Sequence, residues 1–395
     1  MRTITPLIFQ VYLPAFLIHI GWSMTIPIIP LYARELGAGL GVIGLIVAAK
    51  GIGPLILNIP SGMLISKYGN RPVLLITTVL SLLTPVGAGL TGSIVVLAIM
   101  ILLMGGAERV WTFTRVNYVR AVVPVDRRGR AIASLGGISR IAGLLGPIIG
   151  GVVGKYLGLK WVFYAQGAIT LLVLIQLLLS KKTKEVHVPV AEDQSKGLSA
   201  VIDVLRTHKT SFLTVGLVTV VFGVLRTGRH IVFPLWGEYI GLDVAQIGLI
   251  FGLISAVDMT LFFPAGTLMD RKGRKWAAVP SLVIMSISFL VLPVAGSFGL
   301  LLVVGLLHGF GNGLGSGIVM TMGSDLSPKY HAGEFLGIWF LFSSVGHLIG
   351  PAAIGYLSQL LTMSAASWAA GGIGLAGAAF MLFFVADTLK KTQRN

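Results

Sequence analysis

The sequence predicts an all-α membrane protein in which twelve transmembrane helices form two pseudosymmetric six-helix bundles. Composition, the spacing of apolar runs and an internal repeat support this fold class. Of the 395 residues, 55% are hydrophobic and 11% are charged, whereas about a quarter of the residues in a soluble domain are charged. This composition excludes a soluble enzyme of the same length.

Twelve apolar runs bounded by Gly, Pro and charged residues predict the membrane spans. They cover residues 6–30, 41–65, 72–91, 94–120, 129–155, 160–180, 210–235, 244–268, 276–296, 298–324, 333–360 and 364–387. Twelve spans of about 20 residues use about 240 residues. The remainder suffices for loops and tails but is too short for an additional soluble domain.

An internal repeat relates the two halves of the chain. At a constant offset of 204 residues, IGLI at 43–46 recurs at 247–250, and Gly146-Pro147 recurs as Gly350-Pro351. We therefore expect an N-terminal bundle over 1–180, a polar linker over 181–209 and a C-terminal bundle over 210–395. Two parallel repeats of this kind are an architecture of transporters.

The distribution of Lys and Arg predicts the orientation in the membrane. The loops and tails on the side of the two termini hold 21 of these residues, whereas the opposite loops hold three. Positively charged loops remain in the cytoplasm, so we expect both termini there and a multi-pass protein of the cell (inner) membrane. The net charge of +16 is then a consequence of topology and does not indicate a nucleic-acid partner.

Two segments resemble motifs of the major facilitator superfamily. GTLMDRKGRK at 266–275 resembles the loop signature G-x-x-x-D-R-x-G-R-[KR], and GMLISKYGNR at 62–71 occupies the equivalent loop of the first half with Ser66 in place of Asp. GPIIGG at 146–151 and PIIP at 27–30 resemble elements of the 12-helix drug:proton antiporter subgroup. The subgroup's span-4 Arg falls on Leu102 and its span-1 acidic residue on Ile18, so these two roles have no counterpart here.

The resemblance implies a gate built from the loop motifs and the span-5 motif. Facilitator pseudosymmetry would bring Asp270 to Arg130 and Lys67 to Glu334, and we expect these two pairs to close the cytoplasmic side in one conformational state. The competing interpretation is that these are ordinary solvated charges that set topology. The gating residues expected on this basis are Gly62, Ser66, Lys67, Gly69, Arg130, Gly146, Pro147, Gly266, Asp270, Arg271, Gly273 and Glu334.

Charged residues inside a membrane are costly and mark functional sites. Eight of them fall within the predicted spans: Lys50, Glu108, Arg109, Arg115, Arg140, Arg226, Arg229 and Asp258. Glu108 and Asp258 are the acids of this group, so we expect them to couple transport to protons, together with His19. Arg115 and Arg229 lie toward span ends, where structural snorkelling is the alternative.

We expect the remaining intramembrane polar residues, with one aromatic side chain, to bind substrate. Those residues are Trp22, Lys50, Arg109, Arg140, Arg226, His308, Asn312 and His347. For each histidine the alternative is a hydrogen-bonded helix contact, and for Trp22 it is packing. Glycines and prolines recur at the 204-residue offset but the charges do not, which favours a role in binding one asymmetric ligand over a role in the scaffold.

These observations predict a secondary active transporter, with proton-coupled efflux of a small organic or amphiphilic compound as the first hypothesis. The eight intramembrane charges comprise six cations and two acids, which motivates an alternative, transport of an organic anion or anionic lipid headgroup held by Arg. A membrane enzyme is disfavoured because HExxH, GxSxG and Walker motifs are absent, and a non-transporting sensor would carry an appended soluble domain. We expect no cofactor and no metal, protons and the lipid bilayer as partners, and a monomer.

Overall fold

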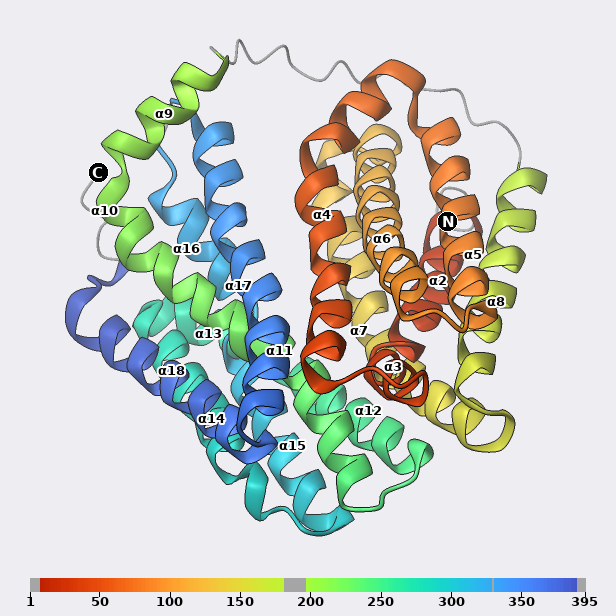
Figure 1. The fold of residues 1–395 in the computed structure, drawn as a ribbon. Coiled ribbons are helices and arrows are strands. Elements are labelled where there is room, and N and C mark those ends of the chain that lie inside the picture. Colours follow the sequence, from red (N-terminus) through yellow and green to blue (C-terminus); the bar gives the residue numbers. More distant parts are fainter. Residues whose placement is uncertain (1–7, 181–196, 329, 389–395) are drawn as a thin grey trace. The chain divides into compact units, whose positions relative to one another are not determined.

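The computed structural model describes residues 8–180, 197–328 and 330–388, and every regular element in this part of the chain is a helix (Figure 1). In chain order the elements are η1 (Ile8–Tyr12), α2 (Leu13–Met24), α3 (Ile28–Glu35), α4 (Leu40–Tyr68), α5 (Asn70–Leu90), α6 (Ile94–Val122), α7 (Val125–Leu157), α8 (Leu159–Leu179), α9 (Gly197–Thr207), α10 (Lys209–Ser211), η2 (Phe212–Gly216), α11 (Leu217–Tyr239), α12 (Val244–Thr260), α13 (Phe262–Lys272), α14 (Lys275–Val291), η3 (Leu292–Val294), α15 (Phe298–Leu314), α16 (Ile318–Leu326), α17 (Ala332–Leu360) and α18 (Met363–Phe384).

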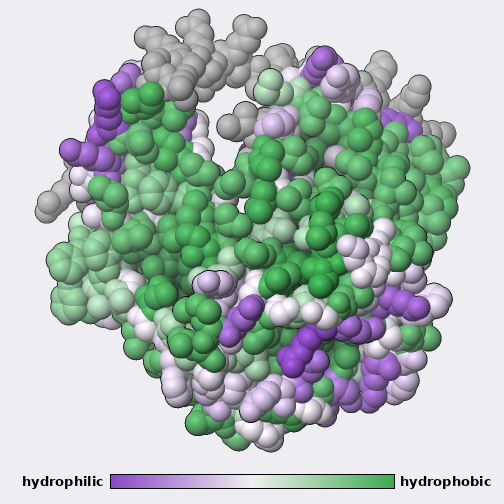
Figure 2. Space-filling view, viewed as in Figure 1, coloured by the Kyte–Doolittle hydropathy of each residue, from purple (hydrophilic) through white to green (hydrophobic). Residues whose placement is uncertain are grey.

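The predicted fold class is confirmed. Among the described residues, eleven helical segments are long and apolar enough to cross a membrane, and the bent pair of α2 and α3 raises the number to twelve. Hydrophobic side chains dominate the visible surface in Figure 2, and hydrophilic ones gather mainly near the top and the bottom of the view. This pattern is expected where lipid surrounds the helices, since a lipid-facing side chain has no reason to be polar.

Several predicted spans are interrupted. The first span is not one helix over 6–30, because the chain bends by 43° between α2 and α3. Pro27 lies at this bend and has no N–H to continue the helical hydrogen bonds. The predicted span 298–324 is likewise divided into α15 and α16, where Gly317 adopts a positive φ of 79°. The predicted linker contains helix α9, which contacts α17, while its residues 181–196 lie outside the described residues.

The chain forms two compact units. Unit 1 comprises Met1–Ala38, Leu45–Glu192 and Leu242–Gly252, and unit 2 comprises Gly39–Gly44, Asp193–Gly241 and Leu253–Asn395. Each unit thus includes a short segment from the other sequence repeat, namely the first turn of α4 in unit 2 and the first half of α12 in unit 1.

Glycine contacts recur in the two units at the offset of the sequence repeat. In unit 1 a side chain at Gly248 would overlap Pro147 and Gly151, and in unit 2 a side chain at Gly44 would overlap Pro351 and Gly355. The tight turns before α5 and α14 are equivalent as well, with φ of 83° at Gly69 and 112° at Gly273. The repeat read from the sequence is therefore a repeat of helix packing.

Helices α4 and α6 of unit 1 pack backbone to backbone. A Cβ at Gly105 would overlap the carbonyl oxygen of Lys50, and one at Gly53 would overlap the backbone nitrogen of Gly106. Small residues allow membrane helices to pack backbone to backbone. These glycines therefore fix the distance between two helices that carry ionisable side chains.

We predict that Gly53→Ala destabilises the protein while Gly62→Ala on the same helix does not. The added methyl at position 53 meets backbone, and overpacking of this kind costs about 1–3 kcal/mol, whereas Gly62 has no neighbouring atom within 4 Å of a Cβ. Thermal unfolding in detergent measures the difference. Equal melting temperatures for the two variants would contradict the close crossing.

Candidate functional site

Unit 1 holds an ion pair inside the membrane-spanning region. The Lys50 ammonium on α4 lies 2.8 Å from Glu108 Oε1 on α6, and the two side chains are 22% and 18% exposed. A charge in this environment needs a partner, and the glycine-mediated crossing at Gly105 supplies it by bringing the two helices together. The pair joins one residue predicted to couple protons with one predicted to bind substrate.

An aromatic column lies in the core of the same unit. The His19 ring is 4.8 Å from the Trp22 ring and 6.0 Å from the Trp111 ring, in edge-on geometry. His19 Nδ1 lies 2.6 Å from the Ala15 carbonyl oxygen, and since a carbonyl only accepts, Nδ1 carries the proton and Nε2 of the neutral ring keeps its lone pair. Trp22 is only 6% exposed, so in this conformation it serves packing.

Arg115 continues this column. Its guanidinium carbon lies 5.0 Å from the centre of the Trp111 ring, a cation–π contact, and Trp111 Nε1 donates to Thr78 Oγ1 at 3.1 Å. The Arg115 side chain is buried, and it therefore does not snorkel to the surface as the alternative supposed. Of the other predicted arginines of unit 1, Arg109 is exposed on α6 and Arg140 is half-buried on α7.

Unit 2 places Arg226 against a helix break. Arg226 Nη2 donates to the Gly315 carbonyl oxygen at 2.7 Å, and its guanidinium carbon lies 5.0 Å from the Phe222 ring. This carbonyl lies in the turn between α15 and α16, where it also accepts from the Ile318 N–H at 3.1 Å. The sequence indicated the charge at this position but not this structural partner, because the break in the predicted span 298–324 was not expected.

The remaining predicted residues of unit 2 form an electrostatic cluster around His308. Asp258 lies within electrostatic range of Arg229, His308 within range of both Arg229 and Arg226, and His347 within range of Arg226. The His308 ring is fully buried against the Phe233 and Phe289 rings, at 5.7 and 5.5 Å. The fold thus gathers five side chains from α11, α12, α15 and α17.

Several polar atoms of this cluster are buried without a hydrogen bond within the described residues. Ser288 Oγ donates to the Met285 carbonyl at 2.6 Å and lies 2.9 Å from His308 Nδ1, so Nδ1 donates and Nε2 keeps its lone pair. The atoms concerned are His308 Nε2, two nitrogens of Arg229 and, one turn after His308 on α15, Asn312 Oδ1. Buried polar groups are normally satisfied, so these atoms hold unused donor and acceptor capacity in this conformation.

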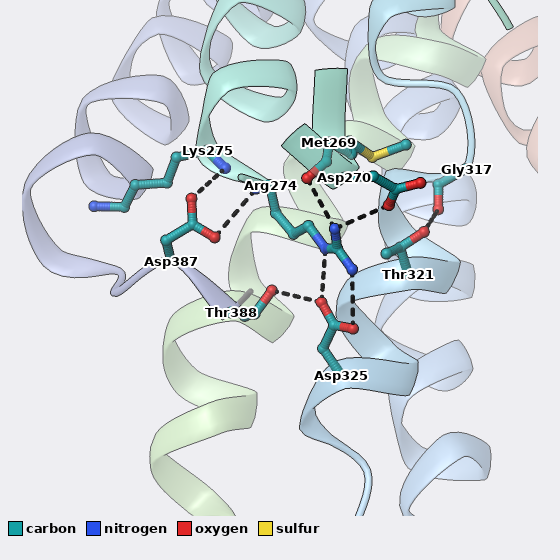
Figure 3. Close-up of polar contacts among 9 residues, drawn as sticks. All are labelled: Met269, Asp270, Arg274, Lys275, Gly317, Thr321, Asp325, Asp387 and Thr388. Carbon is teal, nitrogen blue, oxygen red and sulfur yellow. Dashed lines mark hydrogen bonds and ion pairs between the residues drawn. The ribbon is translucent and has the colours of Figure 1, made fainter. Parts of the chain in front are cut away.

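The loop signature of unit 2 is held by a network that centres on Arg274 (Figure 3). Its guanidinium binds the Asp325 carboxylate at 2.8 and 3.3 Å, Asp270 Oδ1 at 3.2 Å and the Met269 carbonyl at 2.8 Å. The Asp325 carboxylate raises the pKa of Arg274, which keeps the guanidinium charged. We did not single out Arg274 or Asp325 from the sequence, although Arg274 stands in the signature itself.

The segment after α18 completes this network. Thr388 donates to Asp325 at 2.9 Å, and the Asp387 carboxylate accepts from the backbone N–H groups of Arg274 and Lys275 at 3.1 and 3.3 Å. A carboxylate here caps the first turn of α14. Gly273 between α13 and α14 has a φ of 112°, a conformation that side-chain-bearing residues rarely adopt, which explains the glycine at this position of the signature.

The other predicted gating residues have local roles in this conformation. Ser66 donates to the Gly62 carbonyl at 3.0 Å within α4, Glu334 lies 3.1 Å from His331, and Gly146 allows α7 to contact Ile20 and Ser23 of α2. Lys67, Arg130, Asp270 and Arg271 are exposed, and Gly266 has no atom within 4 Å of a Cβ. The two latches expected between Asp270 and Arg130 and between Lys67 and Glu334 remain predictions.

A further ion pair at the end of α7 was not found from the sequence. Lys155 Nζ lies 2.9 Å from Asp243 Oδ2 within unit 1. Asp243 Oδ1 accepts from the Gln246 N–H, and Gln246 Oε1 accepts from the Asp243 N–H, which is a reciprocal cap on α12. At the equivalent place in unit 2, Gln359 accepts a hydrogen bond from the Gly41 N–H at 2.8 Å.

These features define the class of protein: a multi-pass helical membrane protein with duplicated bundles and ionisable groups in its membrane core. The family model of the Major Facilitator Superfamily matches residues 11–228 and again 215–395. The chain belongs to this superfamily and is a transporter, not an enzyme.

Relatives and solved structures agree with this assignment. A multi-drug resistance efflux pump PmrA homolog of Lactococcus lactis is 24% identical over 365 residues, covering 89% of each chain. Multidrug resistance protein MdtG of Citrobacter koseri is 24% identical over 372 residues, covering 86% of this chain and 85% of its own. The nucleoside transporter NupG shares the fold with a TM-score of 0.77 at 16% identity, covering 96% of this chain and 99% of its own.

We predict that Arg274→Gln lowers the stability of the protein much more than Asp270→Asn. The first change leaves the nearly buried Asp325 carboxylate without its counter-charge, which typically costs about 3–5 kcal/mol. The second removes a contact of a side chain that is 76% exposed, and such pairs contribute about 0–1 kcal/mol. Thermal unfolding of both variants tests this, and equal effects would contradict a network centred on Arg274.

We also predict that the cap at Asp243 stabilises the protein only when its carboxylate is ionised. The Gln246 N–H and the Lys155 ammonium lower the pKa of Asp243, and an unfolded Asp titrates at about 3.9. The stabilisation is therefore fully present above about pH 5 and is lost as the pH falls through the folded pKa, below about 4.

The measurement compares melting temperatures of wild type and Asp243→Asn between pH 3 and pH 7. The difference between them shrinks at the acid end of this range. Asp126→Asn serves as the control, since that carboxylate is 72% exposed. A difference that stays constant over the whole range would contradict the role of the charge.

Proposed function

We propose that this transporter exports a small organic or amphiphilic compound in exchange for protons by alternating access, as a monomer in the cell (inner) membrane with both termini in the cytoplasm. Two relatives whose names denote multidrug resistance and drug efflux, the PmrA homolog and MdtG, support this function. The structural observation that carries it is the intramembrane Lys50–Glu108 pair.

The chemistry of that pair suits proton coupling. While Glu108 is ionised, Lys50 and Glu108 neutralise each other and can remain in a low-dielectric environment. When a proton binds the carboxylate, the ammonium of Lys50 loses its counter-charge and is stabilised only by water. Protonation thus favours a conformation that hydrates Lys50, and deprotonation favours one in which the pair is closed.

Asp258 provides a second acid of the same kind in unit 2. Its carboxylate lies within electrostatic range of the Arg229 guanidinium, so protonation of Asp258 would weaken the attraction that it exerts on Arg229. His19 Nε2 offers a lone pair near the membrane core of unit 1. We propose that these three residues take part in proton transfer and that Glu108 is the principal one.

The polar cluster of unit 2 supports substrate binding by that unit. Its buried donors on Arg229 and acceptors on His308 and Asn312 suit an organic compound that carries hydrogen-bonding groups. We propose that the Asp270–Arg130 and Lys67–Glu334 latches form and break during the cycle, since Asp270 and Lys67 are exposed at helix ends.

A second candidate function is transport of an organic anion. The presence of Arg226 and Arg229 beside His308 favours it. However, Glu108 neutralises Lys50, and Asp258 lies within electrostatic range of Arg229. Arg226 already donates to the Gly315 carbonyl, and Arg115 is buried on Trp111. These contacts leave fewer cationic groups free to bind an anion, so export of an organic compound that is not an anion is the better supported function.

We predict that Glu108→Gln abolishes proton-driven transport and that Asp258→Asn reduces it by at least tenfold. Liposomes with an imposed pH gradient are loaded with ethidium, a cationic dye, or with carboxyfluorescein, an organic anion, and flux is followed by fluorescence. Asp126→Asn, an exposed acid outside the membrane core, is the control.

Each outcome of this assay is decisive. Flux of ethidium that depends on the gradient and on Glu108 supports the proposal. Gradient-driven flux of carboxyfluorescein alone supports the second candidate function instead. If both acid variants retain wild-type flux, the assignment of the coupling residues is wrong.

A further inference from the structure

A cavity of about 400 Å³ lies in unit 1 between α4, α5 and α6, apart from the ion pair and the aromatic column. Its lining is apolar almost throughout and includes Gly53, Leu57, Ile76, Leu80 and Gly106. The hydroxyl of Thr77, also in the lining, donates to the carbonyls of Val73 and Leu74 on its own helix. The cavity therefore presents hydrocarbon to whatever fills it.

The dimensions of this groove suit a hydrocarbon chain. Gly53 and Gly106 line it where α4 and α6 meet, and Tyr68 lines it at the end of α4. At 1.5 Å per residue the distance along α4 from Gly53 to Tyr68 is about 22 Å, compared with about 15 Å for half of the hydrocarbon core of a bilayer. The groove thus runs from the middle of the membrane to one interface.

Its interfacial end is positively charged. Tyr68 is 52% exposed, and the Lys67 ammonium lies 5.2 Å from the centre of its ring. Arg71 at the start of α5 holds the end of α8 by donating to Ser180 at 3.1 Å, and Arg120 is exposed near the end of α6. Between residues 40 and 123 Glu108 is the sole acid, and it pairs with Lys50, so nothing acidic on these helices opposes the charge of this end.

We propose that this groove binds one acyl chain of a membrane phospholipid with an anionic headgroup, and that Lys67 and Tyr68 hold the headgroup. An apolar groove gains little by exchanging one lipid chain for another, because the surrounding bilayer is equally apolar. Selectivity must therefore come from the charged end, where basic residues attract anionic headgroups. The lipid is bound as a resident partner of unit 1 and is not the transported compound.

Two large exposed side chains on one face of α5 differ in whether they line the groove. Ile76 is 59% exposed and lines the groove, and Leu83 lies two turns further along the same face at 57% exposure, outside the lining. A bulky residue at position 76 fills the groove, whereas the same residue at position 83 meets only bulk lipid. The two positions therefore form a matched pair for a test.

The test measures lipid affinity by native mass spectrometry of the purified full-length transporter, with phosphatidylglycerol and phosphatidylcholine as probes. In wild type the first phosphatidylglycerol binds about fivefold more tightly than the first phosphatidylcholine, as expected for one basic contact. Lys67→Gln removes this preference. Ile76→Trp and Leu80→Trp lose the high-affinity site for the first phosphatidylglycerol, while Leu83→Trp keeps it. Melting temperatures confirm that the variants are folded.

Three results would overturn the proposal. Equal affinity of wild type for the two lipids would exclude selection of the headgroup. A tight first site that survives both Ile76→Trp and Leu80→Trp would place the lipid elsewhere. If ethidium displaces phosphatidylglycerol from this site in wild type but no longer does so in Leu80→Trp, the groove would instead be a site for the exported compound.

Discussion

Close packing of glycine-bearing helices is the constraint on which the rest of this structure depends. A membrane core cannot hold a lone charge at low cost, so a residue such as Lys50 must meet its partner directly. The backbone contact between Gly105 and Lys50 brings α6 near enough to α4 for Glu108 to close that pair at 2.8 Å. A larger residue in place of Gly105 would move the two helices apart and separate Lys50 from Glu108.

The scaffold is duplicated but the polar residues within it are not. Glycine contacts such as Gly248 with Gly151 and Gly44 with Gly355 occur in equivalent places of the two units. In contrast, Lys50 and Glu108 of unit 1 correspond to Ile254 and Asn312 of unit 2. Unit 1 thus carries an ion pair where unit 2 carries a hydrogen-bonding side chain, which suits a division of labour between proton coupling and substrate binding.

Features with a regular spacing were predictable from the sequence. The apolar runs predicted the spans, the 204-residue offset predicted the duplication, and the signature at 266–275 indicated the superfamily. Each of these is a local or periodic property of the chain. The presence of intramembrane charges was equally predictable, because hydropathy makes an isolated Glu108 or Asp258 conspicuous.

The partners of those charges were not predictable, because they depend on breaks and crossings in three dimensions. Arg226 binds the carbonyl of Gly315 in the turn that follows α15, and Arg274 binds Asp325, which lies 51 residues later on α16. The bend at Pro27 and the helix within the predicted linker were missed for a related reason, since both lie where the apolar pattern is weak or interrupted.

Ion pairing by Glu108 is the central element of this account, and proton movement tests it most directly. A pH-sensitive dye inside liposomes containing the transporter reports protons that move when ethidium is added without an imposed gradient. The account predicts that ethidium drives proton movement through wild type and none through Glu108→Gln. Equal proton movement in the two proteins would contradict it.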